Sequence, residues 1–211
     1  LIIKFKFDST KPRLNNFGVA SPMVTGHAGQ NPIFNTISAH YVELAQNQFT
    51  QLGAGAILYH APETTLGGST AIDFSKSKIV HENETFLEIP LNQIPAGNYD
   101  WMRVSLSYQN YQINVRFKDG NNVYQDTPGT FASFVGYNTY INTHQVVNTV
   151  FNVNANRLQG YWSFVLNNYP FSTSGQAIGT TVPNPLSATS PIPAGSCVVT
   201  GNFPSTLSIT G

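Results

Sequence analysis

The sequence predicts an all-β protein, folded as an antiparallel β-sandwich of the immunoglobulin-like or jelly-roll-like type with long surface loops. Apolar and polar residues alternate along most of the chain, as they do in strands that bury one face. Clusters of Gly, Pro, Asn and Asp separate the alternating segments, as expected for turns between antiparallel strands. A sheet with one apolar face needs a second layer to cover it, which favours a sandwich.

The clearest strand pattern lies in residues 84–126, and the rest of the chain is expected to fold around it. Between Asn110 and Lys118 every second residue is apolar, namely Tyr111, Ile113, Val115 and Phe117. The preceding run repeats the alternation with Met102, Val104, Leu106 and Tyr108. A Pro-Ala-Gly turn at 95–97 precedes the first run, and an Asp-Gly-Asn-Asn turn at 119–122 follows the second. These features predict an antiparallel meander.

The other elements follow in chain order from the same signals. Residues 35–52 fit either a helix or a strand, and we favour the strand because their neighbours are strands. Long loops are expected at 9–32, 62–77 and 169–195, where Pro, Gly, Ser and Asn dominate without periodicity. Further strands are expected at 1–8, 53–60, 131–141, 146–153, 160–166, 196–203 and 206–210.

Length and composition favour one sandwich domain over residues 1–211. Charged residues make up 9% of the chain, far below the roughly 25% of typical soluble domains. The 10 basic residues balance the 10 acidic ones. We exclude nucleic acid as a partner because no basic patch supplies electrostatic attraction to phosphates. No apolar run approaches the roughly 20 residues of a membrane-spanning helix, so no transmembrane segment is expected.

The two ends of the chain suggest an exported protein that continues beyond this sequence. The chain starts without Met, and both ends fall in strand-like runs. We therefore expect truncation at both ends, with a signal peptide, a linker or a lipid anchor upstream of Leu1. The expected location is extracellular, at the cell surface or in the periplasm.

Sequence motifs of enzymes are missing. The chain has no nucleophile elbow, phosphate-binding loop or dinucleotide-binding fingerprint, and no paired carboxylates or nucleophile–base grouping can be identified. We therefore expect no enzymatic activity and no catalytic residues. The lone cysteine, Cys197, lies in an apolar run and is expected to be a buried free thiol.

Two groups of residues are candidates for binding. Trp101, Tyr99 and Trp162 offer aromatic surfaces on which a glycan could stack, unless a second sheet or a loop covers them. His40 and His60 lie in strand-like segments and are candidate metal ligands if those strands are neighbours. The alternative is that both are ordinary surface or core histidines.

Four segments resemble MbnP-like β-sandwich domains, which occur in secreted and lipid-anchored proteins, notably of Bacteroidota. The run Glu-Ile-Pro-Leu-Asn-Gln-Ile-Pro-Ala-Gly-Asn-Tyr at 88–99 resembles the turn and strand of that family. Segments 1–8, 39–44 and 160–164 resemble its opening strand, its second strand and its Trp-bearing strand. The resemblance implies an exported sandwich domain, and copper as a cofactor because some members bind it. Without that resemblance, no cofactor is expected.

Three functions are left open by these observations. The first is a non-catalytic surface or periplasmic binding module that contacts a partner protein or a glycan, which the low charge, the abundant amides and the long loops favour. The second is a copper-binding MbnP-like protein that uses the candidate histidines. The third is a structural subunit of a cell-surface assembly, because strand-like ends can pair with other chains.

Overall fold

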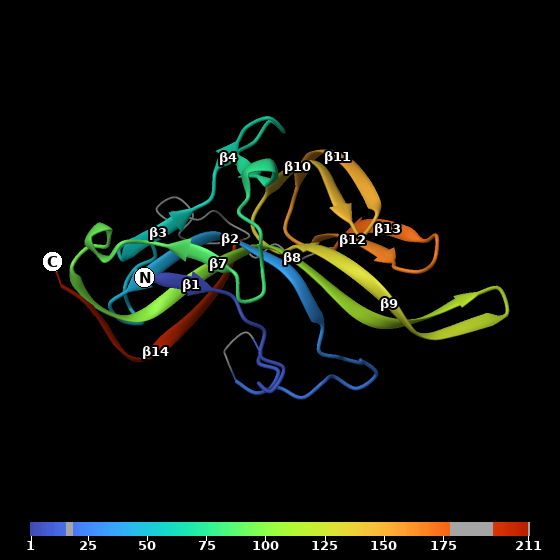
Figure 1. The fold of residues 1–211 in the computed structure, drawn as a ribbon, viewed down its shortest axis with the longest axis horizontal. Helices are drawn as coiled ribbons and strands as arrows, with labels where there is room; N and C mark the ends of the chain where they lie inside the picture. The colour runs from blue at the N-terminus through green and yellow to red at the C-terminus, as the bar shows by residue number, and fades with distance from the viewer. Residues whose placement is uncertain (16–18, 178–195, 211) are drawn as a thin grey trace.

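The structure is a computed structural model that describes residues 1–15, 19–177 and 196–210, and it confirms the all-β, antiparallel prediction (Figure 1). These residues contain no α-helix, and neither of their two short 3-10 helices, η1 (Phe74–Lys76) and η2 (Leu91–Gln93), has the length or apolarity to cross a bilayer. The strands are β1 (Ile2–Lys4), β2 (Ile33–Ala45), β3 (Ala56–His60), β4 (Glu63–Thr64), β5 (Ala71–Asp73), β6 (Val80–His81), β7 (Thr85–Glu88), β8 (Gly97–Asp119), β9 (Asn122–Phe134), β10 (Thr139–Val146), β11 (Thr149–Arg157), β12 (Tyr161–Leu166), β13 (Ser172–Gln176) and β14 (Cys197–Ile209).

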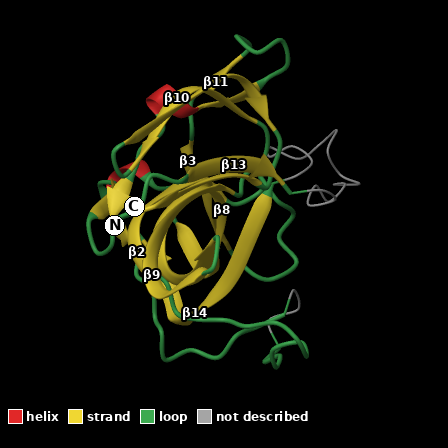
Figure 2. Ribbon diagram, turned by 90° about the vertical axis from the view of Figure 1, so that its right-hand side faces the viewer, coloured by secondary structure: helices red, strands yellow, loops and turns green. Residues whose placement is uncertain are grey.

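The strands form three sheets. The largest is an 8-stranded sheet in the order β13-β12-β9-β8-β2-β3, to which β14 adds by pairing with β8 and β6 by pairing with β2. A 4-stranded sheet has the order β11-β10-β5-β4, and a 2-stranded sheet joins β1 to β7. Only β10 and β5 pair in parallel among the described strands. Figure 2 shows the 8-stranded sheet curling into a half-barrel, with β10 and β11 stacked above it.

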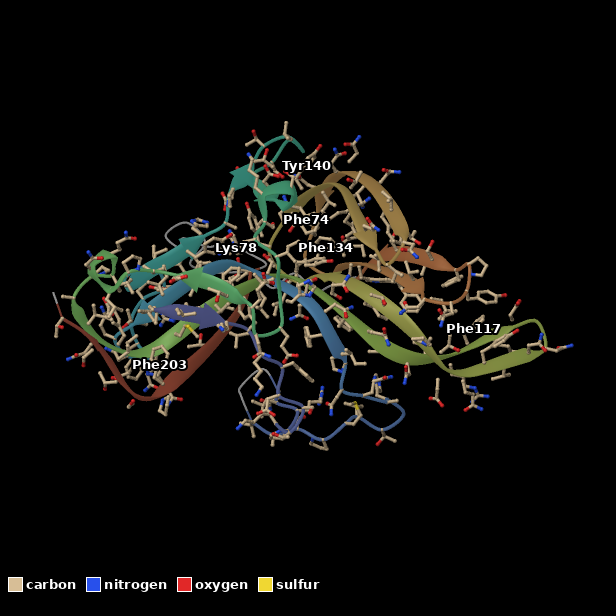
Figure 3. The ribbon with its side chains drawn as sticks, viewed as in Figure 1. Phe74, Lys78, Phe117, Phe134, Tyr140 and Phe203 are labelled. Carbon is tan, nitrogen blue, oxygen red and sulfur yellow. The ribbon has the colours of Figure 1, made fainter. Side chains whose placement is uncertain are left out.

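The 4-stranded sheet covers one face of the 8-stranded sheet, which we call the sandwich face. Phe74 of η1 and Phe134 of β9 meet between the two layers, with ring centroids 5.2 Å apart (Figure 3). The buried apolar residues of this core are Tyr108, Ala132, Phe134, Ile141, Val146, Tyr161 and Val165. Burial of these side chains supplies the main driving force for stacking the layers.

The 2-stranded sheet covers part of the opposite face. Phe86 of β7 is fully buried there and packs with Ile3 of β1. Their partners in the 8-stranded sheet are Ala39, Val42, Val80 and Val104. The molecule is therefore a sandwich whose second layer is divided between the two faces of one large curved sheet.

One long strand, β8, replaces the two strands expected in the central stretch. Ser38 lies opposite Tyr108 and Ala39 lies opposite Leu106, so Ser107 is an extra residue in this part of the ladder. Such a β-bulge shifts the alternation by one residue. The apolar sets on either side of the bulge therefore share a face although their numbering changes from even to odd: Met102, Val104 and Leu106, then Tyr111 and Ile113.

Most of the other predicted strands are present, but their first and last residues differ from the prediction. Residues 33–45 form the strand that we favoured over a helix, and the turn after Asp119 is a two-residue connection in which Gly120 has φ +56°. β1 covers only part of the expected strand at 1–8, and β13 lies inside the expected loop at 169–195. The rest of that loop, 178–195, and the side chain of Cys197 lie outside the described residues.

Candidate functional site

Strand pairing brings His40 and His60 together. β2 and β3 are antiparallel neighbours, and Tyr41 lies directly opposite His60. His40 precedes Tyr41 and is the extra residue of a second bulge, because Ala39 pairs with Leu106 while Tyr41 already pairs with Ser105. The ring centroids of the two histidines are 5.0 Å apart.

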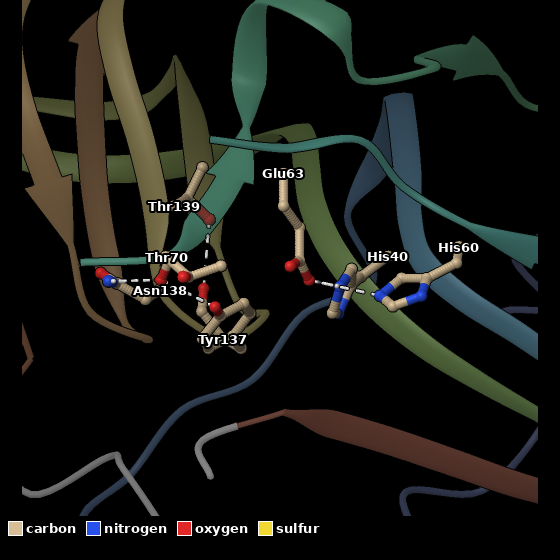
Figure 4. A network of polar contacts seen from close by, with 7 residues as sticks. All are labelled: His40, His60, Glu63, Thr70, Tyr137, Asn138 and Thr139. Atoms are coloured by element: carbon tan, nitrogen blue, oxygen red, sulfur yellow. Dashed lines mark hydrogen bonds and ion pairs between the residues drawn. The ribbon is translucent and has the colours of Figure 1, made fainter. Parts of the chain in front are cut away.

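Glu63 of β4 completes this cluster from the 4-stranded sheet. Its Oε1 atom lies 3.2 Å from Nε2 of His40 and 3.2 Å from Nε2 of His60 (Figure 4). His40 is fully buried, whereas the side chains of His60 and Glu63 are 41% and 28% exposed. The sequence named both histidines but not Glu63 as a candidate ligand. Its position three residues after His60 was the signal that could have found it.

Burial and hydrogen bonding set the charges in the cluster. Burial lowers the pKa of His40, which is therefore a neutral imidazole at neutral pH. The hydrogen bond from His40 lowers the pKa of Glu63, which is therefore a carboxylate. The Nδ1 atom of His40 is buried and makes no hydrogen bond within the described part of the chain, so the ring proton resides on Nε2, facing the carboxylate.

Tyr137, which is buried, packs against the cluster through His40. Its ring stacks on His40 with centroids 5.5 Å apart, and its hydroxyl donates to the carbonyl oxygen of Thr70 at 2.7 Å. Burial raises the pKa of Tyr137 to about 12. Figure 4 shows Tyr137 held in the same polar network as Asn138 and Thr139. Stacking on this anchored ring restrains the orientation of the buried His40 imidazole.

The three aromatic candidates for glycan binding lie in different environments. Tyr99 is 2% exposed, packs in a core with Leu44 and Ile94, and donates its hydroxyl to the carbonyl oxygen of Pro95. In this position it presents no face to a ligand. Trp101 and Trp162 are partly exposed, but on different strands, β8 and β12, with β9 between them in the sheet.

Trp162 ends a row of partly exposed rings on the face opposite the sandwich face, and we call this set the aromatic row. Successive ring centroids are separated by 5.0, 5.8, 5.8 and 5.9 Å. The members, in order, are Phe7, Phe34, Tyr111, Phe131 and Trp162. Except for Phe7, which precedes the long loop, they lie on four adjacent strands, β2, β8, β9 and β12.

Two hollows adjoin the aromatic row. One, of about 280 Å³, is lined by Tyr111, Phe131 and Trp162 together with Ser133. The other, of about 290 Å³, lies where Phe7 and Phe34 meet the core and is lined mostly by apolar side chains. Sequence reasoning missed all members except Trp162, because Phe7 and Tyr111 fit the alternating pattern of buried strand residues and Phe34 fell between an expected loop and an expected strand.

Comparison with known proteins found no relative of this chain. No family model, no curated protein and no solved structure matches this chain.

Proposed function

We propose that this protein is an exported, non-enzymatic binding module that takes a neutral glycan on the aromatic row. The observation that carries the proposal is the continuous set of five partly exposed rings from Phe7 to Trp162. A contiguous aromatic surface on a soluble domain usually marks a binding site, because exposing it to water is unfavourable.

The chemistry of the row favours a neutral, hydroxyl-rich ligand. All five side chains are uncharged, and the hydroxyl groups of Tyr111 and Ser133 lie 3.4 Å apart between the rings. Sugars present C–H faces that pack on aromatic rings and hydroxyl groups that bond to polar side chains at the ring edges. A charged ligand would find no ion-pair partner within the row.

The scaffold holds the row in place before any ligand binds. The backbone of β13 runs close to Trp162, and a Cβ atom added at Gly175 would lie 2.9 Å from the Trp162 ring. Tyr111 and Phe131 lie directly opposite each other in the β8–β9 ladder, and their rings stack at an interplanar angle of 22°. Rings fixed in this way lose little conformational entropy on binding, which favours affinity.

Affinity electrophoresis in gels that contain neutral polysaccharides tests this proposal. The wild-type protein should be retarded, and Trp162→Ala should lose the retardation while its melting temperature stays within a few degrees of the wild type. Trp101→Ala is the matched control, because it removes the other partly exposed tryptophan, which lies outside the row.

Two results would contradict the proposal. One is mobility unaffected by every neutral polysaccharide tested; the other is equal loss in Trp162→Ala and Trp101→Ala. A protein partner whose binding depends on Trp162, without glycan retention, would favour the partner-binding function over the glycan-binding one.

A further inference from the structure

We propose that His40, His60 and Glu63 form a binding site for a divalent transition-metal ion of the zinc and copper class. This site is separate from the aromatic row and needs no glycan. Three potential ligand atoms, one from each side chain, lie within 4.8 Å of one another. They come from three strands of two different sheets, so the fold itself brings them together.

The distances suit a metal ion with little rearrangement. Bonds of about 2.0–2.2 Å from zinc to nitrogen and oxygen, at tetrahedral angles, separate neighbouring ligand atoms by about 3.4 Å. The Nε2 atoms of His40 and His60 each lie 3.2 Å from Oε1 of Glu63. A small outward movement of the Glu63 carboxylate, which is partly exposed, would place an ion between the three groups.

The donor set selects the class of ion. Two imidazole nitrogens and one carboxylate oxygen suit Zn²⁺, Cu²⁺ and Ni²⁺, whereas Mg²⁺ and Ca²⁺ prefer oxygen ligands throughout. The exposure of His60 and Glu63 leaves one side of the cluster open to solvent, so water can fill the remaining coordination position.

Electrostatics also favours a cation here. The cluster brings one carboxyl group together with two imidazole rings, and the ring of Tyr137 stacks on His40. No Lys or Arg side chain within the described residues forms an ion pair with Glu63.

Isothermal titration of the tag-free protein with ZnCl₂, and separately with CuCl₂, tests the site. The wild type should bind one ion and melt at a higher temperature when the ion is present, because a ligand that binds only the folded state stabilises it. MgCl₂ should give neither heat nor a shift. His60→Ala and Glu63→Gln should each weaken binding at least tenfold, since each removes one ligand.

Two further variants decide between this site and unspecific binding. His27→Ala is the control, because it removes an exposed histidine from a loop outside the cluster and should bind like the wild type. His40→Ala is informative only alongside His60→Ala, because His40 is fully buried and its loss can destabilise the fold. No binding by the wild type, or wild-type affinity in both His60→Ala and Glu63→Gln, would overturn the proposal. Glycan retention by the metal-free protein tests the aromatic row independently.

Discussion

Replacing Glu43 by Ala should destabilise the protein by about 3–5 kcal/mol, the usual effect of removing one partner from a buried charged pair. The Glu43 side chain is fully buried on β2, and its Oε1 atom accepts hydrogen bonds from the backbone N–H groups of Gly53 and Gly55 at 3.0 and 2.7 Å. Its Oε2 atom lies 3.7 Å from Nη1 of Arg103. The substitution leaves two backbone donors without their acceptor. It also leaves Arg103, whose Nη2 atom still donates to the carbonyl oxygen of Thr50, without a nearby negative charge.

The two backbone hydrogen bonds contribute more than the ion pair, because 3.7 Å is too long for a hydrogen bond between the charged groups. Glu43→Gln keeps an acceptor for Gly53 and Gly55, so it should cost less than Glu43→Ala. Adding Arg103→Ala to Glu43→Ala should cost less than the sum of the single substitutions, since no unpaired charge remains. Urea unfolding followed by circular dichroism measures all four proteins. A loss below about 1 kcal/mol for Glu43→Ala would refute this account.

Three further substitutions test the core. Burial lowers the pKa of His144 to about 4, so the free energy of unfolding should fall as the pH drops from about 6.5 towards 4, and His144→Gln should flatten that part of the curve. Phe86→Ala should cost about 3–5 kcal/mol in urea unfolding, because its fully buried ring joins β7 to the 8-stranded sheet. Gly129→Ala should lower the melting temperature, because its Cβ would overlap the ring of Phe164.

The fold class was predictable because strand periodicity is local. The alternation in 110–118 and the turn at 119–122 depend only on neighbouring residues, and the structure has a strand and a two-residue turn there. The faces differ at the start of this run, where Asn110 is buried and Tyr111 is partly exposed. The short helical turns and β13 were missed because three to five residues give too little periodicity to recognise. Which sheet faces which is a long-range property, so the divided second layer left no local signal.

The candidate site was predictable in part for the same reason. His40 and His60 were named because both lie in strand-like runs, and their proximity depended on β2 and β3 being neighbours, which the ladder shows. Glu63 belongs to a two-residue strand in an expected loop, so its place beside them could not be read from periodicity. Tyr99 was named as a binding candidate but is buried, because a strand pattern does not reveal which sheet face is covered.

The two bulges explain how one sheet can carry both proposed sites. In a regular ladder, alternation would place Ala39 and Tyr41 on the same face of β2; the extra residue at His40 instead puts Ala39 in the core under the 2-stranded sheet and Tyr41 on the sandwich face. The bulge at Ser107 makes the matching shift in β8. Leu106 therefore packs on the side of the 2-stranded sheet, whereas Tyr108, two residues later, fills the sandwich core. A single residue inserted or removed at either bulge would exchange the two faces beyond it, and a third shift between Phe34 and Thr36 lies beside the aromatic row.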